Sequence, residues 1–134
     1  MKPAILFVDD DMNLLRGIRR ALRQQPYQIF VANSAEMAME MFHREVFELV
    51  VVDQMMNGLP GTELMIWIEK HFPRTVRIML TGHAEIGVMK KAINDGHVFR
   101  FLTKPCHEVE LAMAIQDGLD HLKRESDEAA RTVH

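Results

Sequence analysis

Polar side chains follow four separate apolar runs of this 134-residue sequence, each at the point where the run ends. Those that could do chemistry together are Asp9, Asp10, Asp11, Asp53, Thr81 and Lys104. Carboxylates without Cys or His among them favour a hard cation such as Mg²⁺. A threonine hydroxyl and a lysine ammonium can both donate to phosphoryl oxygens. If the four run ends meet in space, the sequence predicts a phosphoryl-binding site with an aspartate as nucleophile.

These residues can meet only if the runs before them are parallel strands. The expected strands are residues 4–8, 28–32, 48–52, 76–80 and 97–103, and amphipathic helical segments alternate with them. Strict alternation with Val-, Ile- and Leu-rich strands favours a parallel sheet covered by helices on both faces. A closed barrel needs roughly 250 residues. We therefore expect an open, doubly wound α/β fold, in which ligands bind at the carboxyl ends of the strands.

Local signals mark the helix ends and give some of the polar residues an ordinary role as well. Asp11 is expected to cap the first helix. Either Asn33 or Ser34 can cap the second helix, which runs to about residue 44, and Asn33 has capping-box spacing. Gly96 is placed to be a left-handed C-terminal cap. A Thr81-Gly82 pair is more often a turn than a ligand.

The bulk properties exclude several classes of protein. With 48% apolar and 26% charged residues, the chain is expected to form one globular domain. Its net charge of −3 is dispersed, which argues against nucleic-acid binding by this domain. No apolar run approaches the ~20 residues of a membrane helix, and the single Cys106 suits a reducing compartment. We expect a cytoplasmic protein.

Four motifs resemble those of a known family. "ILFVDDD", "LVVVDQMM", "IMLTG" and "FRFLTKP" are similar, in order and spacing, to the receiver domains of two-component response regulators. The resemblance implies a flavodoxin-like fold with five helices and a five-stranded parallel sheet in the order 2-1-3-4-5. We expect a receiver domain at residues 1–124 and a helical extension or linker at residues 125–134.

The resemblance also implies a role for each matching residue. Asp53 would be the phosphoacceptor. Asp10 would bind Mg²⁺ directly and Asp9 mainly through water, and Asp53 and the backbone carbonyl of Met55 would complete the protein ligands. Mn²⁺ is an alternative cation. These roles make the domain a switch rather than an enzyme, with self-phosphorylation from a donor and self-dephosphorylation as its only reactions.

The same resemblance extends beyond the metal ligands. Thr81 and Lys104 would bind the phosphoryl oxygens, and the bond between Lys104 and Pro105 would be cis. Phe101 would be an aromatic switch residue that turns inward when Thr81 moves. The competing interpretation is an ordinary strand aromatic, since Phe99 and Phe101 are expected on one face of the last strand.

Two further positions and one departure concern the loops. Met55 and His83 flank the expected route of an attacking water and would tune the lifetime of the phosphorylated state. The family commonly has Pro where this chain has Asn57, which is followed by Gly58. Because Asn-Gly tolerates positive φ and is less restricted than Pro, the path of this loop is the least predictable part of the site.

Other functions and the partners stay open at this point. A Mg²⁺-dependent aspartyl-nucleophile phosphohydrolase normally has a second Asp where this chain has Met55, and "DDDMN" replaces the glycine-rich loop of a dinucleotide-binding module. A binding-only receiver-like module is disfavoured because no key residue is missing. The expected donor is a sensor histidine kinase, a phosphotransfer protein or a small phosphodonor.

The output is not specified by these residues. "VFRFLTKPCHEVEL" is similar to the segment found in receivers joined to HD-GYP phosphodiesterases, which makes such an output domain one option. A second option is dimerisation through one face of the domain, formed by residues 84–95, residues 97–103 and the helix from residue 108. The chain can be a complete single-domain relay or the front of a larger protein.

Overall fold

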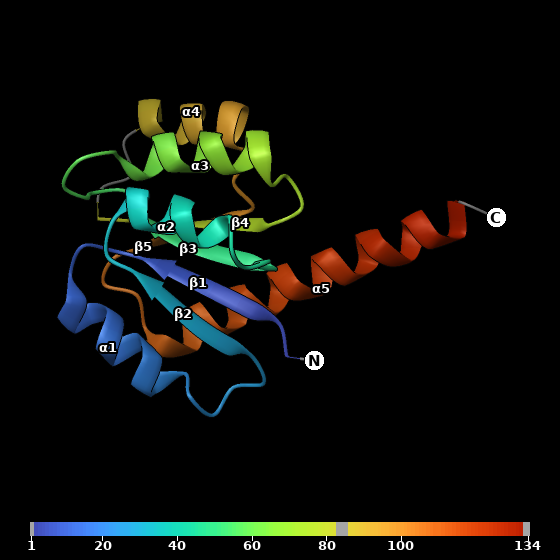
Figure 1. Ribbon diagram of the computed structural model, residues 1–134, viewed down its shortest axis with the longest axis horizontal. Helices are drawn as coiled ribbons and strands as arrows, with labels where there is room; N and C mark the ends of the chain where they lie inside the picture. The colour runs from blue at the N-terminus through green and yellow to red at the C-terminus, as the bar shows by residue number, and fades with distance from the viewer. Residues whose placement is uncertain (1, 83–85, 133–134) are drawn as a thin grey trace.

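A parallel five-stranded sheet organises the chain, in the order β2-β1-β3-β4-β5 (Figure 1). The computed structural model describes residues 2–82 and 86–132. The strands are β1 (Ala4–Val8), β2 (Gln28–Ala32), β3 (Leu49–Asp53), β4 (Val76–Thr81) and β5 (Arg100–Thr103). The helices are α1 (Met12–Ala21), α2 (Ala35–Phe42), α3 (Gly61–His71), α4 (Ile86–Gly96) and α5 (Glu108–Thr132). The predicted fold class and strand order are confirmed.

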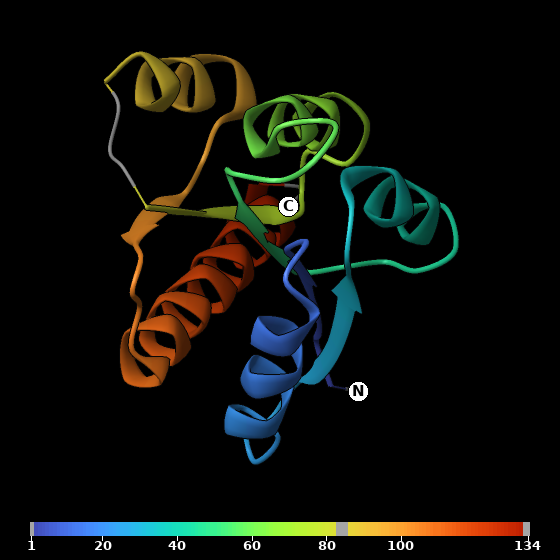
Figure 2. The same cartoon turned by 90° about the vertical axis from the view of Figure 1, so that its left-hand side faces the viewer.

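Helices cover both faces of the sheet. Figures 1 and 2 show α1 and α5 on one side and α2, α3 and α4 on the other. Alternate strand residues point into two separate cores, so that Leu6 and Val50 pack towards α2 and α3, while Ile5 and Val51 pack towards α1 and α5. The central strands are buried on both sides, which is why they read as continuous apolar runs rather than alternating ones.

β3 carries Asp53 to the functional edge of the sheet. It lies between β1 and β4, and all five of its residues are buried, including Asp53 at its carboxyl end. Since the strands are parallel, β1, β4 and β5 end at the same edge. An aspartate fixed on a central strand has little freedom to move away from its neighbours.

The helix caps partly match expectation. The Asp11 carboxylate accepts hydrogen bonds from the backbone N–H groups of Asn13 and Leu14, so its predicted capping role is confirmed. Ser34, rather than Asn33, caps α2.

The predicted left-handed cap at Gly96 is wrong. Gly96 is the last residue of α4, and the positive φ of 47° belongs to the next residue, His97. A Cβ at Gly96 would lie 3.0 Å from the Cβ of Met65 on α3. The glycine is therefore suited to the close packing of α4 on α3 rather than to a turn.

β5 begins three residues later than expected, at Arg100 instead of residue 97. Phe99 therefore lies outside the alternation of the strand and packs into the core beside α5, whereas Phe101 packs into the core on the other side of the sheet. The expectation that Phe99 and Phe101 share one face is wrong for this reason.

α5 is the longest helix and extends beyond the sheet at its C-terminal end (Figure 1). Its packed half contributes Leu111, Ala114 and Ile115 to the core, while residues 123–131 are exposed. In the described part of the chain, no helix combines the length and the apolar character that crossing a membrane requires.

Arg77 fastens the edge of the sheet opposite Asp53. Its side chain is buried and donates to the backbone carbonyls of Gly96, Pro73 and Thr75, and its Nη2 lies 2.6 Å from Glu69 Oε2. One guanidinium thus joins the end of α3, the start of β4 and the end of α4. A buried arginine is favourable only when its donors are satisfied in this way.

We expect Arg77→Met to lower the free energy of unfolding by about 3 kcal/mol, because three carbonyls and Glu69 would lose their common donor. Chemical denaturation measures the change. Arg100→Met is the matched control, since Arg100 also lies on a strand but pairs with the exposed Asp117, and it should cost under about 1 kcal/mol. Equal losses in the two variants would contradict the role assigned to Arg77.

Candidate functional site

Three carboxylates converge at the carboxyl edge of the sheet. One oxygen from each of Asp9, Asp10 and Asp53 lies within 4.8 Å of the other two. Asp9 and Asp53 are each only 3% exposed, whereas Asp10 is open to solvent. The sheet therefore brings together the three acidic side chains that the sequence analysis placed in one site.

The three consecutive aspartates after β1 have three different environments. The backbone N–H of Asp9 donates to the carbonyl of Ala32 and so extends the pairing of β1 with β2. Its Oδ1 accepts from the N–H of Asp11, 2.9 Å away, and Asp11 in turn caps α1. Only Asp9 and Asp10 face Asp53 as candidate ligands in the cluster.

Lys104 supplies the positive charge at this edge. Its Nζ lies 3.1 Å from Asp53 Oδ1 and 3.2 Å from Asp9 Oδ2. The Lys104 backbone N–H donates to the carbonyl of Thr81, and the following peptide bond to Pro105 is cis. The ammonium therefore reaches from the end of β5 across β4 to the carboxylates of β1 and β3.

The charges in this cluster do not balance. Burial raises the pKa of the Asp53 carboxyl, the nearby Lys104 ammonium opposes that rise, and the charge of Asp9 adds to it. Burial lowers the pKa of the Lys104 ammonium, but its contacts with Asp53 and Asp9 outweigh this, and the pKa is raised. Within the described residues, no well-directed hydrogen bond reaches Asp53 Oδ1, so its contact with Lys104 is an ion pair.

A divalent cation suits this donor set. The three carboxylates face one nearby ammonium, which leaves about two negative charges uncompensated when all are ionised. The candidate ligands are all oxygens, the preference of Mg²⁺ and Mn²⁺, and Mg²⁺ is commonly held through only one or two carboxylates. Asp9, Asp10 and Asp53 are the residues that would hold such an ion.

The loop between β3 and α3 is closed by residues that the sequence analysis did not select. Gln54 Oε1 accepts from the N–H of Thr62 at 2.8 Å and from its hydroxyl, and the N–H of Gly61 donates to the Gln54 carbonyl. A Cβ at Gly61 would collide with the backbone carbonyl of Asp53. The available signals in the sequence were the polar Gln54 beside Asp53 and the glycine at the start of α3. The contacts that these residues make depend on the path of the loop, which the sequence does not show.

The Asn57 loop has a defined path. The backbone N–H of Asn57 donates to Asp10 Oδ2 at 2.9 Å, and Gly58 follows with a φ of 85°. The loop thus turns at the Asn-Gly pair and lies against the end of β1. This contact joins the loop after β3 to the loop after β1.

Three of the four remaining predicted residues lie in the described part of the chain. Thr81 is buried at the end of β4, opposite Thr103 of β5. Phe101 is half-buried and pairs in register with Met79. Met55 is 73% exposed, so it borders solvent rather than filling the site. His83 lies outside the described residues.

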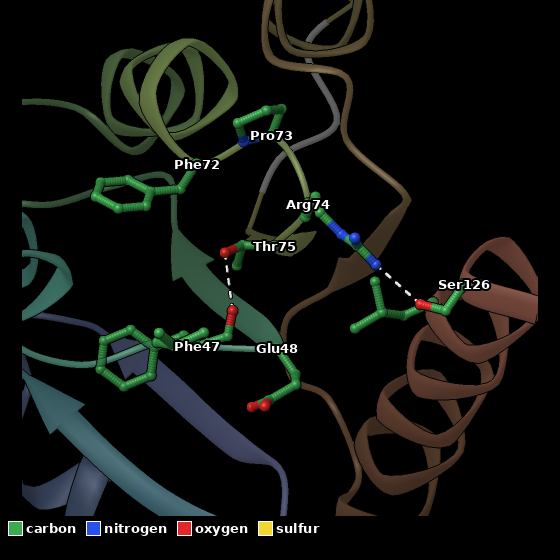
Figure 3. Close-up of a pocket in the computed structure, with 9 residues that line it drawn as sticks. Phe47, Glu48, Phe72, Pro73, Arg74, Thr75 and Ser126 are labelled. Atoms are coloured by element: carbon green, nitrogen blue, oxygen red, sulfur yellow. Dashed lines mark hydrogen bonds between the residues drawn. The ribbon is translucent and has the colours of Figure 1, made fainter. Parts of the chain in front are cut away.

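A separate apolar pocket of about 430 Å³ lies at the opposite edge of the sheet. Figure 3 shows Phe47, Phe72 and Pro73 around it, with the Arg74 side chain donating to the Ser126 hydroxyl of α5 at 2.8 Å. The pocket adjoins the start of β3, whereas Asp53 is at its end. It is therefore not part of the carboxylate site.

Comparisons with known proteins agree with this geometry. Residues 5–116 match the family model described as the response regulator receiver domain. The chain is 36% identical over 131 residues to the transcriptional regulatory protein GlrR of Escherichia coli (strain K12), covering 97% of this chain and 29% of that protein. It thus spans less than a third of that relative.

Solved structures show the same fold. The signal receiver domain of an HD domain-containing protein from Pseudomonas fluorescens Pf-5 is 31% identical with a TM-score of 0.88, covering 94% of this chain and 93% of that chain. A response regulator receiver domain protein (CheY-like) from Methanospirillum hungatei JF-1 is 28% identical with a TM-score of 0.89, covering 93% and 99%.

The raised pKa of Asp53 predicts a pH-dependent effect of Asp53→Asn on stability. Because the folded-state pKa exceeds the ordinary value of 3.8, the folded state binds more protons than the unfolded state between these two values, and stability falls as pH rises through them. Without divalent cation, the variant should therefore unfold at a higher temperature than wild type at pH 7, and the difference should vanish near pH 3. Calorimetry in chelator measures this, and a less stable variant at pH 7 would contradict it.

Proposed function

We propose that this chain, which belongs to the response regulator receiver family, acts as a phosphorylation-dependent signalling switch. Its proposed phosphoacceptor is Asp53. The observation that carries the proposal is the position of this carboxylate. Asp53 is fixed at the end of a buried central strand, beside Asp9 and Asp10 and 3.1 Å from the Lys104 ammonium. This is the environment that an aspartate nucleophile and its phosphorylated product both require.

The proposed reaction is an in-line transfer. An Asp53 oxygen attacks the phosphorus of the donor, a new O–P bond forms, and the bond from phosphorus to the donor breaks, so that the donor leaves with those electrons. Lys104 binds an oxygen of the transferring group and offsets its charge, and Thr81 donates its hydroxyl. Asp9, Asp10, Asp53 and the Met55 carbonyl would hold Mg²⁺, which would supply further positive charge. Mn²⁺ can take its place.

The proposed signal passes from Asp53 to β4 and β5. Phosphorylation places strong acceptor oxygens beside the strand ends, and Thr81 moves towards them. Phe101 then turns inward and alters the surface of α4, β5 and α5. One contact supports this route, since the Lys104 N–H donates to the Thr81 carbonyl. Phe101 lies on β5, three residues before Lys104.

Partners and output follow from the family in general form, and we propose the rest. A sensor histidine kinase or a phosphotransfer protein supplies the phosphoryl group in the cytoplasm, and small phosphodonors can replace it. Residues 1–124 form the receiver and residues 125–134 a helical extension. The relative in Escherichia coli is named a transcriptional regulatory protein, and one structural neighbour comes from an HD domain-containing protein. An HD-type output and a dimer through α4, β5 and α5 both remain proposals.

A phosphohydrolase function has less support. Such an enzyme needs an acid or base close to its nucleophile, and the residue two positions after Asp53 is the exposed Met55. Met55 and His83 are better proposed as residues that tune the lifetime of the phosphorylated state.

Incubation with acetyl phosphate and Mg²⁺ tests the phosphoacceptor. Intact-protein mass spectrometry should show one added phosphoryl group, and Asp53→Asn should abolish it because the nucleophile is gone. Asp11→Asn is the matched control: Asp11 lies beside the cluster but caps α1, so this variant should still be phosphorylated. Wild type that gains no phosphoryl group under saturating donor would count against the proposal.

Phe101→Ala tests the switch. We expect this variant to be phosphorylated normally but to lose the phosphorylation-dependent change in hydrogen exchange across α4, β5 and α5. Phe99→Ala is the control, because Phe99 is an aromatic neighbour that packs on the other side of the sheet. An unchanged exchange response in Phe101→Ala would remove Phe101 from the mechanism.

A further inference from the structure

The backbone N–H of Asn57 makes a contact that ties two functional loops together. It donates to Asp10 Oδ2 at 2.9 Å, linking residues 47 positions apart. Asp10 is the exposed member of the carboxylate cluster, and its side chain is not held by packing as those of Asp9 and Asp53 are. We propose that the Asn57 N–H is a positioning group that holds the Asp10 carboxylate ready for a divalent cation. This inference rests on the proposed function.

Electrostatic repulsion explains why Asp10 needs such a group. Without a cation, the carboxylates of Asp9 and Asp53 repel that of Asp10, and an exposed side chain is free to turn towards solvent. Lys104 offsets only part of this repulsion, because its single charge contacts Asp9 and Asp53. A hydrogen bond from N–H to a carboxylate is charge-assisted and directional, so it keeps Asp10 beside the other two.

The contact is compatible with metal binding. A carboxylate has two oxygens, so one can accept the N–H while the other binds a cation. The same hydrogen bond also restrains the segment that begins at Met55, whose carbonyl is the remaining proposed protein ligand. A single backbone donor therefore limits the freedom of ligands from two different loops before the cation arrives.

The residue type at position 57 decides whether this contact can exist. Proline has no N–H, so a chain with Pro at this position has no donor to offer Asp10. Asn57 retains the donor, and Gly58 takes the positive φ of 85° that the turn requires. A Cβ at Gly58 would lie 3.7 Å from Glu36 Oε1, so the turn also lies near the start of α2.

Two variants separate the N–H from the Asn57 side chain. Asn57→Pro removes the donor, whereas Asn57→Ala keeps it and removes the amide side chain. Titration calorimetry with Mg²⁺ should show binding to Asn57→Pro that is about five- to tenfold weaker than to wild type, which matches the loss of one charge-assisted hydrogen bond at an exposed site. Asn57→Ala should bind within about twofold of wild type.

The kinetics provide a readout that a general structural defect would not reproduce. In phosphorylation by acetyl phosphate, the Mg²⁺ concentration that gives half the maximal rate should rise in Asn57→Pro by the same factor, while the rate at saturating Mg²⁺ stays close to that of wild type. A loss of the saturated rate with unchanged Mg²⁺ dependence would overturn the positioning role.

A measurement on native Asn57 avoids the conformational restriction of proline. In metal-free wild type, the Asn57 amide should exchange with solvent more slowly than a free loop amide, and Asp10→Ala should speed its exchange. Exchange of the Asn57 amide at the unprotected rate in wild type would overturn the inference. So would an Mg²⁺ affinity of Asn57→Pro equal to that of wild type. A loss of Mg²⁺ affinity in Asn57→Ala as large as that in Asn57→Pro would overturn it as well. Wild type that binds no Mg²⁺ would instead contradict the proposed function, and this inference with it.

Discussion

Repulsion among the carboxylates of Asp9, Asp10 and Asp53 is the main physical constraint on this structure. Asp9 and Asp53 are nearly inaccessible to solvent, and Asp10 joins them at ligand-binding distance. Such an arrangement is unfavourable in isolation, and Lys104 relieves only part of it. The backbone has to supply the rest, through a rigid central sheet and through N–H groups directed at carboxylate oxygens. The fold thus holds these carboxylates in an electrostatically unfavourable arrangement that a bound divalent cation would relieve.

The two edges of the sheet carry different kinds of side chain. At the carboxyl edge the side chains are mostly acidic and the loops carry the candidate ligands. At the other edge Arg77 satisfies three carbonyls and pairs with Glu69, so the ends of α3 and α4 are fixed to β4. The contacts of Arg77 therefore lie at the edge of the sheet opposite the carboxylates.

Much of this arrangement could be predicted from the sequence, because strand direction alone places Asp9, Asp53, Thr81 and Lys104 at one edge. Asp11 was also predictable, since capping is a local interaction. Gly96 was misassigned because its packing against Met65 depends on a helix 31 residues away in the chain. The clamp between Gln54 and Thr62 and the contact between Asn57 and Asp10 could not be predicted, because both depend on how a loop closes in space.

The length of α5 beyond the sheet determines how far its C-terminal end moves when the helix tilts. The helix contacts the body of the domain as far as Ser126, whose hydroxyl accepts from Arg74, while Asp127 to Thr132 continue beyond it as helix. At 1.5 Å per residue those last residues span about 9 Å. A tilt of about 10° at Ser126 would carry the helix end through about 1.5 Å. Any change at the carboxyl edge of the sheet that tilts α5 would therefore displace the C-terminal end of this helix most.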